Sequence, residues 1–212
     1  MTNSFEQSLD HAPVIALINV DDAEQAFRAG TACWAGGFRL VAIAASIATA
    51  PDLVSALGSR SDLLVGLWDV QTREELDTFD LNRVAFVFGT KAAVQAAQIS
   101  GVPSVLITSK TGLADNAESA LCIPNIERLD GIATVAEFEH ETRNKDLFVH
   151  GEIGGDECAS YLDAGARALI LTNALMSPSL LNSGDYRSIR NYAAAVHQAA
   201  THLSRNTQEK TA

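Results

Sequence analysis

Eight short apolar runs, separated by stretches with helical spacing, constrain the fold of this chain more than any other feature of its sequence. The runs are apolar almost throughout rather than alternating, which is typical of parallel strands whose outer faces are covered by helices. They occupy Val14–Ile18, Leu40–Ala44, Leu63–Leu67, Val84–Phe88, Pro103–Ile107, Ala120–Ile123, Leu147–Val149 and Ala168–Leu171.

The segments between these runs have the composition and apolar spacing of helices. They are Asp22–Ala35, Ala50–Leu57, Thr72–Phe79, Ala92–Ile99, Asn125–His140 and Asp156–Leu162. Glycines at 36–37, 101 and 165 each follow such a segment and precede an apolar run, where a left-handed residue ends a helix. The order of elements predicts an α/β fold of the (β/α)8, or TIM barrel, class. We expect an added N-terminal helix over Ser4–Asp10 and a long amphipathic C-terminal helix over Asp185–Arg205.

The length of 212 residues suits one barrel domain, which we place at residues 1–205, with a flexible polar tail over 206–212. An open doubly wound sheet is the competing architecture. Such a sheet normally carries a glycine-rich dinucleotide loop after its first strand, and the segment Ile18–Asp22 contains no glycine.

The charge balance is strongly acidic, with 15 Lys and Arg against 26 Asp and Glu, a formal charge of −11 and a pI near 4.8. Such a surface repels phosphodiester backbones, so nucleic acid is excluded as an expected partner. No apolar run is long enough to span a membrane, and the first ten residues lack the basic and apolar regions of a signal peptide. We therefore expect a cytoplasmic protein, and no motif indicates a cofactor.

Four separated blocks of the sequence resemble one enzyme family. They are APVIALINVDDAEQA, WAGGFRLVAI, AAVQAAQISGVPSVL and HGEIGGDECASYLDAGARALIL. In this order and spacing they are similar to the 2-keto-3-deoxy-6-phosphogluconate / 4-hydroxy-2-oxoglutarate aldolases, over residues 12–176. The resemblance implies a (β/α)8 barrel, a homotrimer, and chemistry on a small 2-oxo acid through a Schiff-base lysine.

The residues that would carry this chemistry are replaced. The family's lysine on the sixth strand matches Leu121, and its general-base glutamate on the second strand matches Ala42. The positions matching its carboxylate clamp, its turn after the third strand and its phosphate loops are Asn19, Ala44, Ser46, Asp69, Glu152 and Thr172. A carboxylate at position 152 would repel an incoming phosphate. The pattern therefore favours a homologue without the family's catalytic residues.

The function we expect from this pattern is that of a non-catalytic binding or structural subunit, a pseudoenzyme. Its partner would be another protein, a further copy of itself in a homotrimer, or a small 2-oxo acid. Trp68 and His150, both at the expected carboxyl ends of strands, are candidate binding residues.

The alternative is a carbon–carbon lyase, an aldolase or decarboxylase, acting on an unphosphorylated 2-oxo acid. Lys110, just after the fifth strand, would be the relocated nucleophile. A divalent metal held by Asp69, His150 and Glu152 could instead polarise an enolate, although the residue spacing is a weak metal signal.

Overall fold

The computed structural model describes residues 4–108, 120–126, 131–141 and 145–211, with side chains described as far as His202. Lys110 lies outside the described residues. Within the described part, no helix is both long enough and apolar enough to cross a membrane.

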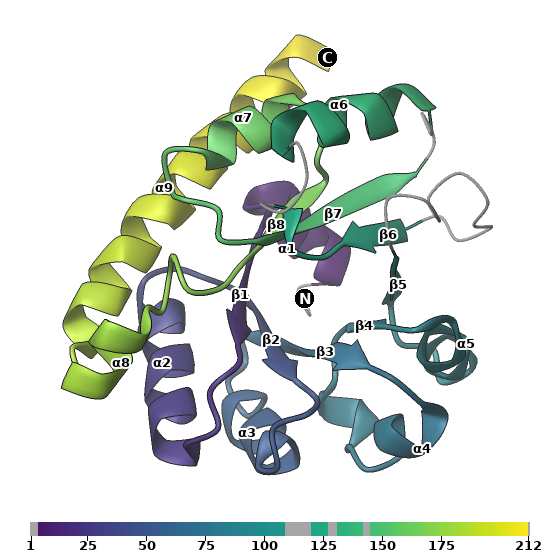
Figure 1. Ribbon diagram of the computed structural model, residues 1–212, viewed down its shortest axis with the longest axis vertical. Helices are drawn as coiled ribbons and strands as arrows, with labels where there is room; N and C mark the ends of the chain where they lie inside the picture. Colours follow the sequence, from purple (N-terminus) through teal and green to yellow (C-terminus); the bar gives the residue numbers. More distant parts are fainter. Residues whose placement is uncertain (1–3, 109–119, 127–130, 142–144, 212) are drawn as a thin grey trace.

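Eight parallel strands close into a barrel in which each strand pairs with the next and the eighth pairs with the first (Figure 1). The strands are β1 Val14–Ile18, β2 Leu40–Ala44, β3 Leu64–Val70, β4 Val87–Gly89, β5 Ser104–Ile107, β6 Ala120–Ile123, β7 Asp146–Gly151 and β8 Ala168–Leu171. The predicted (β/α)8 class is confirmed, and the doubly wound alternative is wrong.

Helices surround the barrel and cover its outer surface. They are α1 Phe5–His11, α2 Ala23–Ala35, α3 Ala50–Leu57, α4 Arg73–Leu76, α5 Lys91–Ile99, α6 Gly131–Glu141, α7 Cys158–Asp163, α8 Pro178–Ser183 and α9 Tyr186–Thr211, with a 3-10 turn at Leu81–Arg83. The long α9 runs along the outside of α2, α7 and α8 (Figure 1).

The helix boundaries follow local capping chemistry that is visible in the sequence. Asp22 accepts a hydrogen bond from the backbone N–H of Gln25 at 2.8 Å and so starts α2. Ser4 and Gln7 form a reciprocal capping box at the start of α1. Gly165 follows α7 with a φ of +109°, which a residue with a Cβ rarely adopts.

Several elements differ from the sequence-based expectation. The helix predicted over Thr72–Phe79 is limited to Arg73–Leu76, because Asp80 caps a separate 3-10 turn directly after it. The strand expected over Val84–Phe88 pairs as Val87–Gly89, since the chain is still leaving that turn at Val84. Helix α9 continues past Arg205 to Thr211, through the segment expected to be a tail. Helix α8 was not predicted.

A continuous stack of rings fills the barrel interior, and we call it the aromatic column. Phe88 on β4 lies 5.3 Å from Phe148 on β7, measured between ring centroids. These strands are not neighbours, so the contact crosses the interior. Phe5 of α1 stacks on Phe86 at 4.6 Å, which places α1 across one end of the barrel (Figure 1). The column consists of Phe5, Phe86, Phe88, Phe148, Trp68 and His150.

Small residues on β2 and β3 leave space for these rings. Ala42 is in register with Gly66, and Ala44 with Trp68, so all four side-chain positions face the interior. A Cβ at Gly66 would collide with the ring of Phe86. The absence of side chains at this level of β3 is therefore a packing requirement of the column.

Truncating the column should destabilise the whole domain. Phe86 is fully buried, so Phe86→Ala removes a ring and leaves a cavity, and we expect the free energy of unfolding to fall by about 3–5 kcal/mol. Ile99→Ala is the control, because Ile99 is 82% exposed and its truncation should change stability by no more than about 0.5 kcal/mol. Urea unfolding measures both, and equal effects would contradict this description of the core.

Candidate functional site

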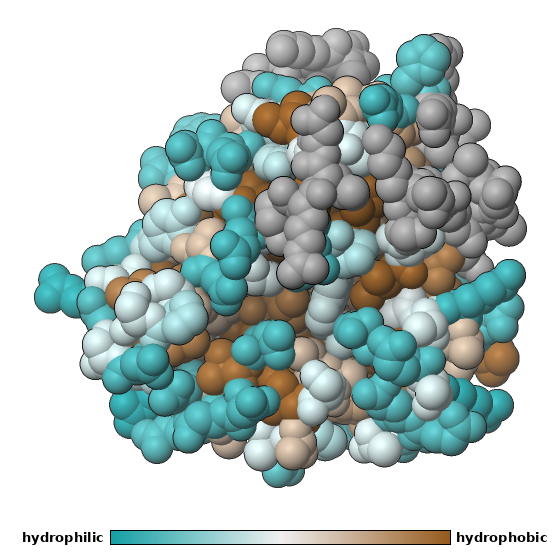
Figure 2. All heavy atoms as spheres, viewed as in Figure 1, coloured by the Kyte–Doolittle hydropathy of each residue, from teal (hydrophilic) through white to brown (hydrophobic). Residues whose placement is uncertain are grey.

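A cavity of about 650 Å³ opens at the carboxyl ends of the strands, where the aromatic column stops. Its lining residues come from β1, β3, β5 and β7, from the segments that follow β1, β6, β7 and β8, and from helices α2 and α8. In Figure 2, apolar atoms lie in a hollow near the middle of this face, with hydrophilic side chains around it. Active sites of (β/α)8 barrels form at this end, which makes the cavity the candidate site.

Trp68 and His150 form the floor of the cavity. Their rings lie 4.4 Å apart between centroids, and they remain only 8% and 9% exposed. Both residues line the cavity, as expected for candidate binding residues. Sequence spacing alone could not show this contact, because the two rings come from strands β3 and β7, which are not neighbours in the barrel.

His150 is held in its neutral form. Burial lowers the pKa of its imidazole from 6.5 to about 4. The backbone N–H of Asn125 donates a hydrogen bond to His150 Nδ1 at 3.1 Å, so the ring proton lies on Nε2. At neutral pH the residue therefore offers the cavity a hydrogen-bond donor without a positive charge.

Two non-glycine residues in the described part of the chain have a positive φ, and both line this cavity. Asp69 has a φ of 60°, at an irregularity in the register between β3 and β4 that turns its side chain toward the mouth. Asn125 has a φ of 54° directly after β6. Backbone strain of this kind costs free energy and concentrates at ligand-binding sites.

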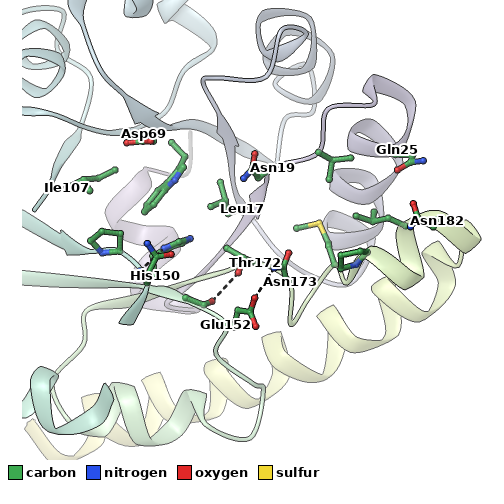
Figure 3. Close-up of a pocket in the computed structure, with 18 residues that line it drawn as sticks. Leu17, Asn19, Gln25, Asp69, Ile107, His150, Glu152, Thr172, Asn173 and Asn182 are labelled. Carbon is green, nitrogen blue, oxygen red and sulfur yellow. Dashed lines mark hydrogen bonds between the residues drawn. The ribbon is translucent and has the colours of Figure 1, made fainter. Parts of the chain in front are cut away.

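The two carboxylates of the cavity each accept a hydrogen bond from an amide. Gln71 Nε2 donates to Asp69 Oδ1 at 2.6 Å. Asn173 Nδ2 donates to Glu152 Oε1 at 2.9 Å (Figure 3). Burial raises the pKa of Asp69, the Gln71 hydrogen bond opposes this shift, and the charge of Glu75 adds to it. Thr172 donates to the carbonyl of Gly151 at 3.3 Å, which joins the ends of β7 and β8.

The predicted metal ligands do not form a metal site. Asp69, His150 and Glu152 all line the cavity, but no group of three or more His, Cys, Asp or Glu side chains within the described ranges is placed to share one ion. Figure 3 shows the reason, since Asp69 and Glu152 lie on different sides of the cavity.

The remaining positions matched to the aldolase site lie in three different places. Asn19 and Thr172 line the cavity, whereas Ser46 lies exposed in the loop after β2 and is not part of the lining. Ala42 and Ala44 face the interior below the mouth, packed beside the aromatic column.

Leu121 faces away from the barrel interior. It is in register with Leu147, the neighbour of the inward-facing Phe148, so its side chain points toward the surrounding helices. It is fully buried there. The position matched to the Schiff-base lysine therefore does not reach the cavity.

Sequence reasoning missed several amide side chains of the lining: Gln25, Asn125, Asn173 and Asn182. Asn125 and Asn173 each follow a strand end, a signal that could have indicated them. Gln25 on α2 and Asn182 on α8 become part of the site only through the packing of those helices, for which the sequence has no short-range signal.

The fold is shared with aldolases of known structure. A 2-keto-3-deoxy-6-phosphogluconate (KDPG) aldolase from Legionella pneumophila, with pyruvate captured at low pH as a covalent carbinolamine intermediate, is 17% identical with a TM-score of 0.79, covering 91% of this chain and 97% of that one. The corresponding aldolase of Zymomonas mobilis ZM4, with 3-phosphoglycerate, is 16% identical with a TM-score of 0.76, over 93% and 96%.

A more distant barrel also superimposes. Tryptophan synthase from M. tuberculosis is 10% identical with a TM-score of 0.69, covering 92% of this chain and 94% of that chain. No protein-family model and no curated protein sequence matches this chain. The aldolase-like fold implied by the sequence resemblance is thus confirmed by structure.

The neutral state of His150 should be visible as a pH dependence of stability. The unfolded imidazole takes up a proton near pH 6.5 and the folded one only near pH 4, so the unfolded state binds more protons between these values. His150 therefore contributes stability above about pH 6.5 that is lost progressively as the pH falls toward 4. Between these pH values, His150 adds up to about 1.4 kcal/mol per pH unit to the slope of the unfolding free energy against pH.

Two measurements test this prediction. Ring resonances of His150 should still report the neutral Nε2–H form at pH 5.5, and His150→Asn, which keeps an acceptor near Asn125 N, should reduce the slope of unfolding free energy against pH. A ring that protonates near pH 6.5 would contradict it.

The strain at Asn125 predicts an unusual ranking of substitutions. Asn125→Gly should be more stable than Asn125→Ala by about 1 kcal/mol, because alanine pays the cost of a left-handed backbone and glycine does not. On the exposed face of α6, Ala136→Gly should instead reduce stability relative to wild type by about 1 kcal/mol. Thermal unfolding of the three variants measures both effects, and a more stable Asn125→Ala would overturn the strain assignment.

Proposed function

We propose that this chain is a non-catalytic protein with an aldolase-type barrel that binds a small molecule in the cavity at the carboxyl ends of its strands. The observation that carries this proposal is that two polar residues with a strained backbone line the cavity. Asp69 and Asn125 have left-handed backbone conformations, and both line the cavity. Such strain is retained where binding requires it.

The residues at the positions matched to the family's lysine and glutamate support a protein that does not use imine chemistry. Leu121 and Ala42 are buried and apolar, so neither can form a Schiff base or shuttle a proton. His150, held neutral, makes its hydrogen bond through Nδ1 to backbone rather than to a nucleophile. The arrangement favours holding a molecule over transforming one.

The second candidate is a lyase acting on a small unphosphorylated 2-oxo acid. Its support is the structural likeness to aldolases, one of which holds pyruvate as a covalent carbinolamine. It requires Lys110 as the nucleophile, and the described part of the chain offers no metal cluster to replace that lysine.

Borohydride trapping distinguishes the two candidates. The protein is incubated with pyruvate or 2-oxoglutarate, reduced, and analysed by intact mass, beside Lys110→Ala and with metal-supported decarboxylation assayed in parallel. We expect no adduct and no turnover, because neither matched position carries a reactive group. An adduct that disappears in Lys110→Ala would establish the lyase in place of the binding protein.

Self-association as a homotrimer, which the family resemblance implies, is part of this proposal. A designed protein cage made by fusing symmetric oligomeric domains is 18% identical with a TM-score of 0.77, over 94% of this chain and 76% of that one. Light scattering would give a mass of three times 22.5 kDa if the trimer forms. A cytoplasmic location remains a prediction from the sequence.

A further inference from the structure

The charge of the cavity disfavours the binding of a carboxylic acid or a phosphate. Asp69 and Glu152 supply carboxylates, and the described residues of the lining include no lysine or arginine. Among the lining residues that the structure describes, His150 alone could become cationic near neutral pH, and burial keeps it neutral. The chain as a whole carries a formal charge of −11. At Asp69 an anionic ligand would therefore meet a like charge, and no lysine or arginine of the described lining would offset it.

The uncharged polar groups of the cavity point to a ligand with many hydroxyl groups. Carboxamides both donate and accept, carboxylates only accept, and His150 Nε2–H donates. A hydroxyl matches all three, because it donates one hydrogen bond and accepts others. The carboxamides and hydroxyl that line the cavity are Asn19, Gln25, Asn125, Asn173, Asn182 and Thr172.

Several of these amides are available to a ligand. The side chains of Asn19, Gln25 and Asn182 make no hydrogen bond within the part of the chain that the structure describes. Figure 3 shows Gln25 and Asn182 together at one end of the cavity and Asp69 at the other, with Asn19 between them. Donors and acceptors are thus spread along the cavity, which suits a chain of hydroxyls better than a single charged head group.

Apolar side chains form the surface between these polar groups. Leu17, Ile107 and Trp68 line the inner part of the cavity, and Met176 and Leu181 line the part near α8. Carbon-bound hydrogens of a polyol can pack on such a surface while its hydroxyls reach the amides. A pocket of this volume with convergent polar groups is large enough for a small organic ligand.

We propose that the cavity binds a small polyhydroxylated molecule that carries no negative charge, with hydroxyls donating to Asp69 and accepting from the surrounding carboxamides. This inference rests on the proposed binding function and names its ligand class. It differs from the phosphorylated or carboxylate-bearing ligands that the structural neighbours hold.

Three probes with one carbon skeleton test the charge requirement. D-gluconate, D-glucitol and D-glucamine differ only in a terminal carboxylate, alcohol or ammonium group. Each is titrated at millimolar concentration into the full 15N-labelled chain, and side-chain amide resonances are followed by NMR. We expect glucitol and glucamine to shift the cavity amides with dissociation constants at least about tenfold below that of gluconate.

Matched variants localise the effect. Asp69→Asn keeps the shape of the side chain and removes one charge. In this variant the dissociation constant of gluconate should come within about threefold of that of glucitol. Asp163→Asn is the control, because Asp163 is exposed at the end of α7, at the opposite end of the barrel, and changes the net charge equally. That variant should retain the wild-type ranking of the three probes.

The outcomes separate this inference from the proposed function. Gluconate binding at least as tightly as glucitol, or no shift of cavity amides with any probe, overturns the ligand class. Neither result restores catalysis, which the borohydride experiment decides by itself. A covalent adduct with pyruvate would overturn the proposed function, whatever the polyol titrations show.

Discussion

The contact between rings across the barrel axis is the interaction on which the rest of this structure depends. A small barrel is stable only when its interior is filled at the density of a close-packed solid. Here phenylalanines from β4 and β7 meet across the interior, and Phe5 closes one end. At the level of the Phe86 ring, β2 and β3 then carry the small residues Ala42 and Gly66.

This distribution of volume also determines the character of the cavity. Because Trp68 and His150 complete the column, both rings at the floor of the cavity are buried and the imidazole stays uncharged. The hydrogen bond from Asn125 orients that ring, and Asn125 itself has a left-handed backbone. Core packing, backbone strain and site chemistry are therefore one connected arrangement rather than separate features.

Much of the fold could be predicted from the sequence because its signals are local. Apolar runs marked the strands, and Asp22 and Ser4 marked helix starts through hydrogen bonds spanning three residues. The site was predicted in part, since Asn19, Asp69, Glu152 and Thr172 follow or end strands and do line the cavity. The outward direction of Leu121 and the stacking of Trp68 on His150 depend on register across the barrel, which no local pattern contains.

The aromatic column also has a consequence for how the chain folds. Phe5 meets Phe86 and Phe148, and β1 pairs with β8, so contacts that complete the core join segments far apart in sequence. A half-built barrel would leave these rings in water with little gain to offset the entropy of closing such long loops. Folding is therefore expected to be slow and strongly cooperative, with the last strand and the first helix ordering together rather than in the sequence in which they leave the ribosome.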